Sequence, residues 1–206
     1  MTKAIVFDMG GVLIDLHLDR CKKNFKEIAG FAEIDRILDA CHQRGAICDL
    51  EDGTITEQQF YDEIIAHSNP GTTPATVREC LCSLVGDVPS DKAALLMELK
   101  DKYPLYILSN NNPITMVRSA ERFAEAGAPL SIFKEIFISS YMKLSKPSTE
   151  IYREAIRRIG LPPEEILFID DSPKNVTAAC SLGIDAVLFN PAEDKLGETV
   201  YQAIKP

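Results

Sequence analysis

Five short runs along the chain are nearly continuous in apolar, often β-branched residues. Strands buried on both faces of a parallel sheet have this pattern, whereas half-exposed strands alternate apolar and polar positions. We therefore expect five buried strands, at Ala4–Phe7, Leu105–Leu108, Glu135–Ile138, Ile166–Ile169 and Ala186–Phe189.

Segments with the pattern of amphipathic helices separate the later runs. Several of them stop at a glycine, a residue that commonly follows the end of a helix. The expected helices are Asp91–Asp101, Pro113–Ala126, Ser148–Ile159 and Pro173–Leu182. Strands that alternate with single helices are typical of a doubly wound parallel sheet. The pattern therefore predicts an α/β fold with a Rossmann-like core.

The stretch between the first and second runs is far longer than one crossover helix requires. It contains no convincing strand and has the pattern of several amphipathic helices, broken by glycines and turns. Thr56 and Gln59 have the spacing of a capping box, which predicts the start of one of these helices. We expect a core of residues 1–15 and 89–206, with a helical insertion over residues 16–88.

Composition and charge narrow the classes of partner. The chain has 206 residues, 46% of them hydrophobic and 26% charged, as expected for a globular protein with its own core. It carries 22 Lys and Arg against 31 Asp and Glu, a net charge of −9. Such a chain repels phosphate backbones, so we expect no nucleic-acid partner. Because no apolar run approaches the roughly 20 residues of a membrane span, we expect no membrane partner.

The N-terminal sequence and the cysteines favour a cytoplasmic protein. The apolar run that precedes Asp8 is too short for a secretory signal. The six cysteines are then expected to be thiols in a reducing compartment. Cys80 and Cys82 have one residue between them, not the two of a typical zinc knuckle. The sequence leaves the oligomeric state open between a monomer and a dimer.

Polar residues follow four of the five runs at their carboxyl ends. In open parallel sheets, ligands bind at this edge. A single Asp there is often only a helix cap, but four polar groups at one edge are harder to ascribe to chance. The groups are Asp8-Met9-Gly10-Gly11, Ser109-Asn110-Asn111-Asn112, Lys146-Pro147 and Asp170-Asp171-Ser172.

The side chains at this edge suit phosphoryl transfer, which depends mainly on positioning and charge stabilisation. Asp8 and Asp171 are carboxylates of the kind that hold a hard cation such as Mg²⁺. Ser109 and Asn110 offer donors to phosphate oxygens, and Lys146 offers a positive charge. An Asp can also act as the nucleophile by forming an aspartyl-phosphate.

These motifs resemble those of the haloacid dehalogenase-like (HAD) hydrolase superfamily, over essentially the whole chain. The resemblance implies a Mg²⁺-dependent phosphatase that acts on a small phosphate monoester, with a sugar phosphate as the first expectation. The helical insertion resembles the cap of the helical-cap subclass, and Gly53–Phe60 is similar to caps of bacterial sugar phosphatases such as α-glucose-1-phosphate phosphatase. The motifs are Phe7–Leu13, Leu108–Asn110, Lys146-Pro147 and Phe168–Pro173.

The resemblance assigns a metal site to four residues. It implies that Asp8 is both the nucleophile and a metal ligand, and that the backbone carbonyl of Gly10 is a second ligand. Asp171 would be the direct carboxylate ligand of the fourth motif. Asp170 would lie close by and contact Lys146 or a water on the metal.

The resemblance also assigns residues to the substrate. Ser109 and Asn110 would hold the phosphate. Lys146 would neutralise the nucleophile and the phosphoryl oxygens, and so would serve both binding and catalysis. Asn175 occupies a position that supports the metal site in the superfamily.

One position departs from the superfamily's phosphatase pattern. Those enzymes usually carry a second Asp two residues after the nucleophile, which protonates the leaving oxygen and later activates water. Here that position is Gly10, and loss of such an acid typically costs about 10²–10⁴-fold in rate. Asp15, His17 or a residue of the cap are alternative proton carriers. His42 and Arg44 are candidates to contact the substrate from the cap.

Two alternatives to a phosphatase remain open. A 2-haloacid dehalogenase of the same fold also lacks the second Asp, but it needs no Mg²⁺ and gives no reason to keep both Asp170 and Asp171. A catalytically weak metabolite-binding or regulatory protein would keep the metal site without turnover. Gly10 is the feature that favours this second alternative.

Overall fold

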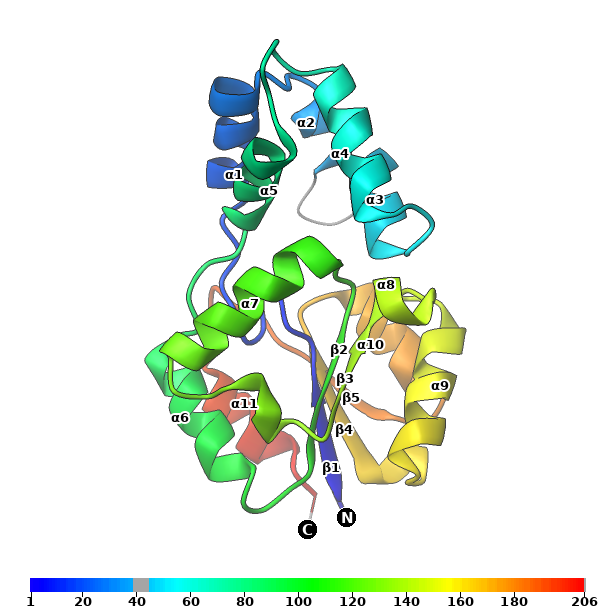
Figure 1. The fold of residues 1–206 in the computed structure, drawn as a ribbon. Helices are drawn as coiled ribbons and strands as arrows, with labels where there is room; N and C mark the ends of the chain where they lie inside the picture. The colour runs from blue at the N-terminus through cyan, green and yellow to red at the C-terminus, as the bar shows by residue number, and fades with distance from the viewer. Residues whose placement is uncertain (39–44, 206) are drawn as a thin grey trace.

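A five-stranded parallel sheet forms the centre of the molecule (Figure 1). The computed structural model describes residues 1–38 and 45–205. The sheet order is β3-β2-β1-β4-β5, and its neighbouring strands pair in parallel. The predicted doubly wound α/β fold is confirmed. The strands are β1 (Ala4–Phe7), β2 (Leu105–Ser109), β3 (Glu135–Ile138), β4 (Ile166–Asp170) and β5 (Asp185–Leu188).

Sheet pairing corrects the predicted strand ends. Strands β2 and β4 continue one residue further than predicted, because Ser109 pairs opposite Ile138 and Asp170 pairs opposite Leu188. Strand β5 begins and ends one residue earlier than predicted. Its expected burial on both faces is wrong: it lies at the sheet edge beside β4, and Leu188 is 46% exposed.

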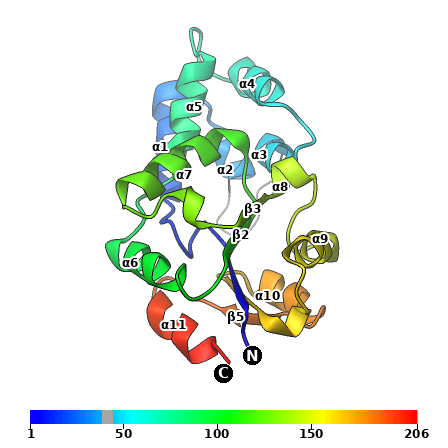
Figure 2. The same cartoon turned by 60° about the horizontal axis from the view of Figure 1, so that its bottom comes forward.

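Helices cover both faces of the sheet (Figures 1 and 2). Side chains alternate along β1, so that Ile5 and Phe7 join one hydrophobic cluster and Val6 joins the other. Full burial of such a side chain stabilises the fold by about 1.5–3 kcal/mol. One face is covered by α6 (Ser90–Leu99), α7 (Pro113–Glu125) and α11 (Leu196–Ala203), and the other by α9 (Thr149–Ile159) and α10 (Pro173–Cys180).

Helix ends follow the capping signals of the sequence. The capping box is confirmed: Gln59 N–H donates to the Thr56 hydroxyl at 3.2 Å, and Thr56 N–H donates to Gln59 Oε1 at 2.9 Å. Asn112 caps α7, because its side-chain oxygen accepts the N–H groups of Ile114 and Thr115 at 3.1 Å each. Helix α9 ends at Gly160, whose φ of 74° suits a residue without a Cβ.

A second group of helices lies beyond the carboxyl ends of the strands, at the top of Figure 1. We call these helices, α1 to α5 with the π-helical turn η1, the helical unit. Its buried residues, among them Phe25, Leu50 and Phe60, form a hydrophobic cluster of their own. The helical pattern predicted for this stretch is confirmed where the structure describes it. The elements are α1 (Leu18–Asn24), η1 (Phe25–Ala29), α2 (Ile34–Ile37), α3 (Gly45–Glu51), α4 (Glu57–Ala66) and α5 (Pro74–Cys82).

The chain crosses between the sheet and the helical unit twice, and the two crossings pair with each other. Asp15 N–H donates to the Asp87 carbonyl at 3.0 Å, and His17 N–H donates to the Leu84 carbonyl at 2.8 Å. Gly86 N–H donates to the Asp15 carbonyl at 2.8 Å. A Cβ at Gly86 would lie 2.7 Å from that carbonyl oxygen, so the pairing requires glycine there.

Two further expectations concern cysteines and membranes. Cys21, Cys48, Cys80, Cys82 and Cys180 are free thiols, and Cys41 lies outside the described residues. Over residues 1–38 and 45–205, no helix has the length and apolar character needed to cross a membrane.

Candidate active site

Three of the predicted motifs meet at the carboxyl edge of the sheet. Asp8 directly follows β1, Ser109 ends β2 and Asp170 ends β4. Strand β1 lies between β2 and β4, so these residues become neighbours although 61 to 162 positions separate them in the sequence. Asp8 N–H donates to the Ile169 carbonyl at 2.8 Å, which extends the sheet by one residue.

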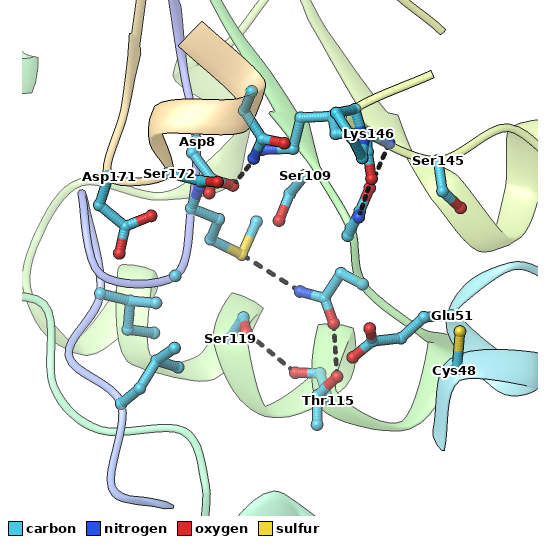
Figure 3. Close-up of a pocket in the computed structure, with 18 of the residues that line it drawn as sticks. Asp8, Cys48, Glu51, Ser109, Thr115, Ser119, Ser145, Lys146, Asp171 and Ser172 are labelled. Atoms are coloured by element: carbon cyan, nitrogen blue, oxygen red, sulfur yellow. Dashed lines mark hydrogen bonds and ion pairs between the residues drawn. The ribbon is translucent and has the colours of Figure 1, made fainter. Parts of the chain in front are cut away.

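Lys146 lies between two of these carboxylates. Its Nζ is 2.9 Å from Asp8 Oδ1 (Figure 3) and 2.7 Å from Asp170 Oδ2, which the figure does not label. The side chains of Lys146 and Asp170 are 1% and 0% exposed. A charge buried this deeply is stable only when it is paired and hydrogen-bonded, and both conditions are met here.

Asn110 holds the main chain of Lys146. Its amide Nδ2 donates to the Lys146 carbonyl at 2.8 Å, and its Oδ1 accepts the Lys146 N–H at 2.8 Å. The amide is therefore occupied by the peptide backbone, and the backbone N–H of Asn110 remains as the group to offer a phosphate. Ser109 is buried and lines the same cavity.

Asp170 and Asp171 occupy different environments. The Asp170 carboxylate accepts hydrogen bonds from Lys146 at 2.7 Å, from Asn175 Nδ2 at 2.9 and 3.1 Å, and from Ser172 N–H at 2.8 Å. Asp171 is only half-buried and lines the cavity. Of the two, Asp171 is therefore better placed to bind a ligand, while Asp170 fixes Lys146.

The acidic cluster fits a hard divalent cation. Asp8, Asp170 and Asp171 each present an oxygen, and these oxygens all lie within 4.8 Å of one another. Carboxylate oxygens at this spacing match the preference of Mg²⁺. Gly11 allows the approach, because a Cβ on it would lie 2.2 Å from Asp171 Oδ2 and its φ is +75°. Gly10 lines the cavity, and its role as a carbonyl ligand stays a prediction.

The electrostatics of the cluster reflect its burial. Burial raises the pKa of Asp8, an effect that Lys146 opposes and the neighbouring acids reinforce. Burial and then Asp170 also raise the pKa of Asp171. Burial alone would lower the pKa of Lys146, but Asp170 and Asp8 together raise it, so this ammonium stays charged. A bound cation would lower the pKa of both cavity carboxyls.

These residues line a cavity of about 470 Å³ between the sheet edge and α3. Such a volume is in the range of small-molecule sites. Thr115 and Ser119 of α7 add hydroxyl groups to its wall, and Cys48, Glu51 and Asp52 line it from the helical unit (Figure 3).

The segment Glu51-Asp52-Gly53 rests directly on the core. Ser139 Oγ donates to the Glu51 carbonyl at 2.6 Å, and Ser145 Oγ donates to Asp52 Oδ1. Gly53 approaches so closely that a Cβ on it would lie 2.2 Å from the Ser140 carbonyl oxygen. Sequence reasoning missed this segment, because an acidic helix end before a glycine is common and only the packing of the helical unit brings it to the cavity.

Two of the proton carriers expected from the sequence, Asp15 and His17, lie away from the cavity. Asp15 Oδ1 is 3.7 Å from Lys92 Nζ, and the His17 ring lies beside Gly86. Neither Asp15 nor His17 lines the cavity. His42 and Arg44 are outside the described residues.

Comparison with known proteins identifies the family. Residues 2–183 match the family model of haloacid dehalogenase-like hydrolases. The chain belongs to the haloacid dehalogenase-like hydrolase family. The family predicted from the four motifs is therefore confirmed for this HAD-like hydrolase.

Several relatives align over nearly the whole HAD-like hydrolase. D-ribitol-5-phosphate phosphatase of Bacteroides thetaiotaomicron is 30% identical over 193 residues, covering 93% of this chain and 92% of the relative. Hexitol phosphatase A of Escherichia coli is 23% identical over 195 residues, covering 93% and 85%. The crystal structure of a mutant HAD family enzyme from Bacteroides thetaiotaomicron, in complex with magnesium and inorganic phosphate, has a TM-score of 0.89 at 32% identity, covering 94% of this chain and 96% of that chain.

Proposed function

We propose that this HAD-like hydrolase is a Mg²⁺-dependent phosphatase that releases inorganic phosphate from a small sugar or polyol phosphate. The observation that carries the proposal is the position of the Asp8 carboxylate, which contacts Lys146 and belongs to the acidic cluster at the edge of a polar cavity. The ribitol and hexitol phosphatases among its relatives support the phosphate ester as the substrate class.

Asp8 acts as the nucleophile in this proposal. Its carboxylate attacks phosphorus, the bond from phosphorus to the ester oxygen breaks, and the phosphoryl group stays on Asp8 as an aspartyl-phosphate. Lys146 and the Met9 N–H hold Asp8 Oδ1, at 2.9 and 2.6 Å, and so orient the attacking group. Water then attacks phosphorus, which frees phosphate and restores Asp8.

The substrate's phosphoryl group is held by the strand ends. The Ser109 hydroxyl and the Asn110 backbone N–H donate to its oxygens, and Lys146 neutralises part of its charge. Such fixed donors act where charge develops and cost no reorganisation during the reaction.

Asp8, Asp171 and the Gly10 carbonyl are the residues that hold Mg²⁺, with Asp170 in support. The cation supplies positive charge that offsets the repulsion between carboxylates and phosphate. The carboxylates fit this role because one oxygen of each lies within 4.8 Å of the others. Lys146 contacts Asp8 and Asp170.

The helical unit serves as a cap in this proposal. It provides one wall of the cavity through α3, opposite the strand ends. Closure of such a wall excludes water and selects small substrates. The hydroxyls of Thr115 and Ser119 donate to Asn111 Oδ1 and to the Thr115 carbonyl, so in the cavity wall their oxygens act as acceptors for the hydroxyl groups of a polyol.

The test is phosphate release from p-nitrophenyl phosphate, ribitol 5-phosphate, a hexitol phosphate and glucose 1-phosphate, with Mg²⁺ and with EDTA. We expect turnover only with Mg²⁺ and an acid-stable phosphoryl adduct on Asp8 by mass spectrometry after a rapid quench. Asp8→Asn should reduce turnover to the background rate. Asp15→Asn is the matched control, because that carboxylate faces Lys92 instead of the cavity, and it should keep wild-type activity.

Other outcomes would replace the proposal. Metal-independent release of halide from 2-chloropropionate, with no phosphate release, would indicate a dehalogenase. Saturable binding of a phosphate ester without turnover would indicate a binding protein. Activity that survives Asp8→Asn would remove Asp8 from the reaction.

A further inference from the structure

The proposed reaction needs a proton at the leaving oxygen, and Gly10 cannot provide it. An alcohol leaves a phosphate ester poorly as an alkoxide, and a positioned acid typically contributes about 10²–10⁴-fold to such a step. Another side chain of the cavity wall must therefore carry this proton. This inference rests on the proposed phosphatase function.

Glu51 is one of two acids that the helical unit places at the cavity, and the other, Asp52, accepts the hydroxyl of Ser145. Glu51 is the last residue of α3, and it lines the same cavity as Asp8, Ser109 and Lys146. Figure 3 shows its side chain extending from α3 toward the space beside Thr115. It thus approaches from the wall opposite the strand ends, where the alcohol part of a bound ester would lie.

The backbone around Glu51 is fixed, which a proton donor requires. The Glu51 carbonyl accepts the Ser139 hydroxyl at 2.6 Å, and the next residue, Asp52, accepts the hydroxyl of Ser145. Gly53 packs on the backbone of Ser140. Three contacts over three residues hold this segment on the same core that carries Asp8.

The surroundings favour a protonated carboxyl. Burial first, and then the charges of Asp52 and Asp8, raise the pKa of Glu51 to about 8. Near neutral pH this group holds a proton that it can donate. The other charged or titratable groups that line the same cavity are Asp8, Asp171, Lys146 and Lys174 from the core, and Cys48 and Asp52 from the helical unit.

We propose that Glu51 is the catalytic acid and base that replaces the carboxylate missing at Gly10. As the bond from phosphorus to the ester oxygen breaks and Asp8 takes the phosphoryl group, Glu51 gives its proton to that oxygen and the alcohol leaves neutral. When water attacks the phosphoryl group on Asp8, Glu51 takes one proton from that water. The cycle ends with inorganic phosphate, the Asp8 carboxylate and a reprotonated Glu51.

The test compares esters with good and poor leaving groups in the Glu51→Gln variant. We expect kcat/KM for ribitol 5-phosphate and glycerol phosphate to fall about 10²–10⁴-fold, because an alkoxide must then leave without a proton. The value for p-nitrophenyl phosphate should change less than about tenfold, because nitrophenolate leaves readily. Asp52→Asn is the control for the anchoring of the segment, and it should affect both ester types equally.

The pH profile of the wild-type enzyme gives a measurement that does not depend on a variant's folding. The kcat/KM for alkyl esters should decline above the Glu51 pKa of about 8, relative to that for p-nitrophenyl phosphate. Equal losses for both ester types in Glu51→Gln, or parallel pH profiles in the wild type, would overturn the role of Glu51. Failure of the proposed function looks different, because the wild type would then release no phosphate from either ester type.

Discussion

Replacing Lys146 with methionine removes a positive charge from between two carboxylates while keeping an unbranched side chain. Lys146 Nζ lies 2.9 Å from Asp8 and 2.7 Å from Asp170, and the Asp170 side chain is 0% exposed. Removal of one partner from a buried ion pair costs about 3–5 kcal/mol, because the other charge stays buried without compensation. Asn175 and Ser172 still donate to Asp170, but they supply no net charge.

We therefore expect Lys146→Met to lower the free energy of unfolding by about 3–5 kcal/mol. For a chain of this size that corresponds to a decrease in Tm of about 6–20 °C. Urea unfolding in EDTA measures this effect, since a divalent cation would otherwise compensate the same carboxylates. The slope of the transition should stay unchanged, because the surface exposed on unfolding is the same.

The double variant Lys146→Met with Asp170→Asn tests the cause. It removes the uncompensated charge at Asp170 and should be more stable than Lys146→Met alone by at least about 1 kcal/mol. A loss below about 1 kcal/mol in the single variant, or a double variant that is no more stable than the single one, would refute the reasoning from buried charge.

Three other substitutions test separate parts of the structure. Folding raises the Glu51 pKa from 4.5 to about 8, so the folded state binds the extra proton and its stability falls as pH rises through this window. Thermal melts across that window should show a smaller fall for Glu51→Gln than for the wild type. Gly53→Ala places a Cβ 2.2 Å from the Ser140 oxygen at a φ of +68°, and should cost about 1–3 kcal/mol in urea unfolding. Thr56→Ala removes the capping box of α4 and should cost about 1 kcal/mol in the same assay, whereas an unchanged midpoint would show that the box contributes nothing.

The core half of the site follows from the sequence because parallel strands all end at one edge. Once Asp8, Ser109 and Asp170 are placed at the ends of apolar runs, their proximity needs no further information than the sheet order. The position of Lys146 is harder to predict from the sequence, because Lys146 lies in a loop. Hydrogen bonds from the Asn110 side chain to its main chain hold it in place.

The half of the site that the helical unit contributes cannot be predicted from local sequence patterns. Glu51 reaches the cavity only because the helical unit folds around its own cluster and rests on Ser139 and Ser140. No periodicity or spacing within one chain encodes that docking. Proximity to Asp8 in the sequence makes Asp15 and His17 candidate proton carriers, but the paired crossings place them beside Lys92 and Gly86 instead.

Those paired crossings constrain how the helical unit can move relative to the sheet. Hydrogen bonds join Asp15 and His17 to Leu84, Gly86 and Asp87, so the two connections deform as one ribbon and not as independent tethers. A ribbon bends across its flat face but resists sliding within its plane, where its hydrogen bonds would stretch. A displacement of the helical unit that keeps these hydrogen bonds would therefore bend the ribbon across its flat face. Such a displacement would also break the contacts of Glu51 and Asp52 with Ser139 and Ser145, so the proposed acid would face Asp8 only while the helical unit rests on the core.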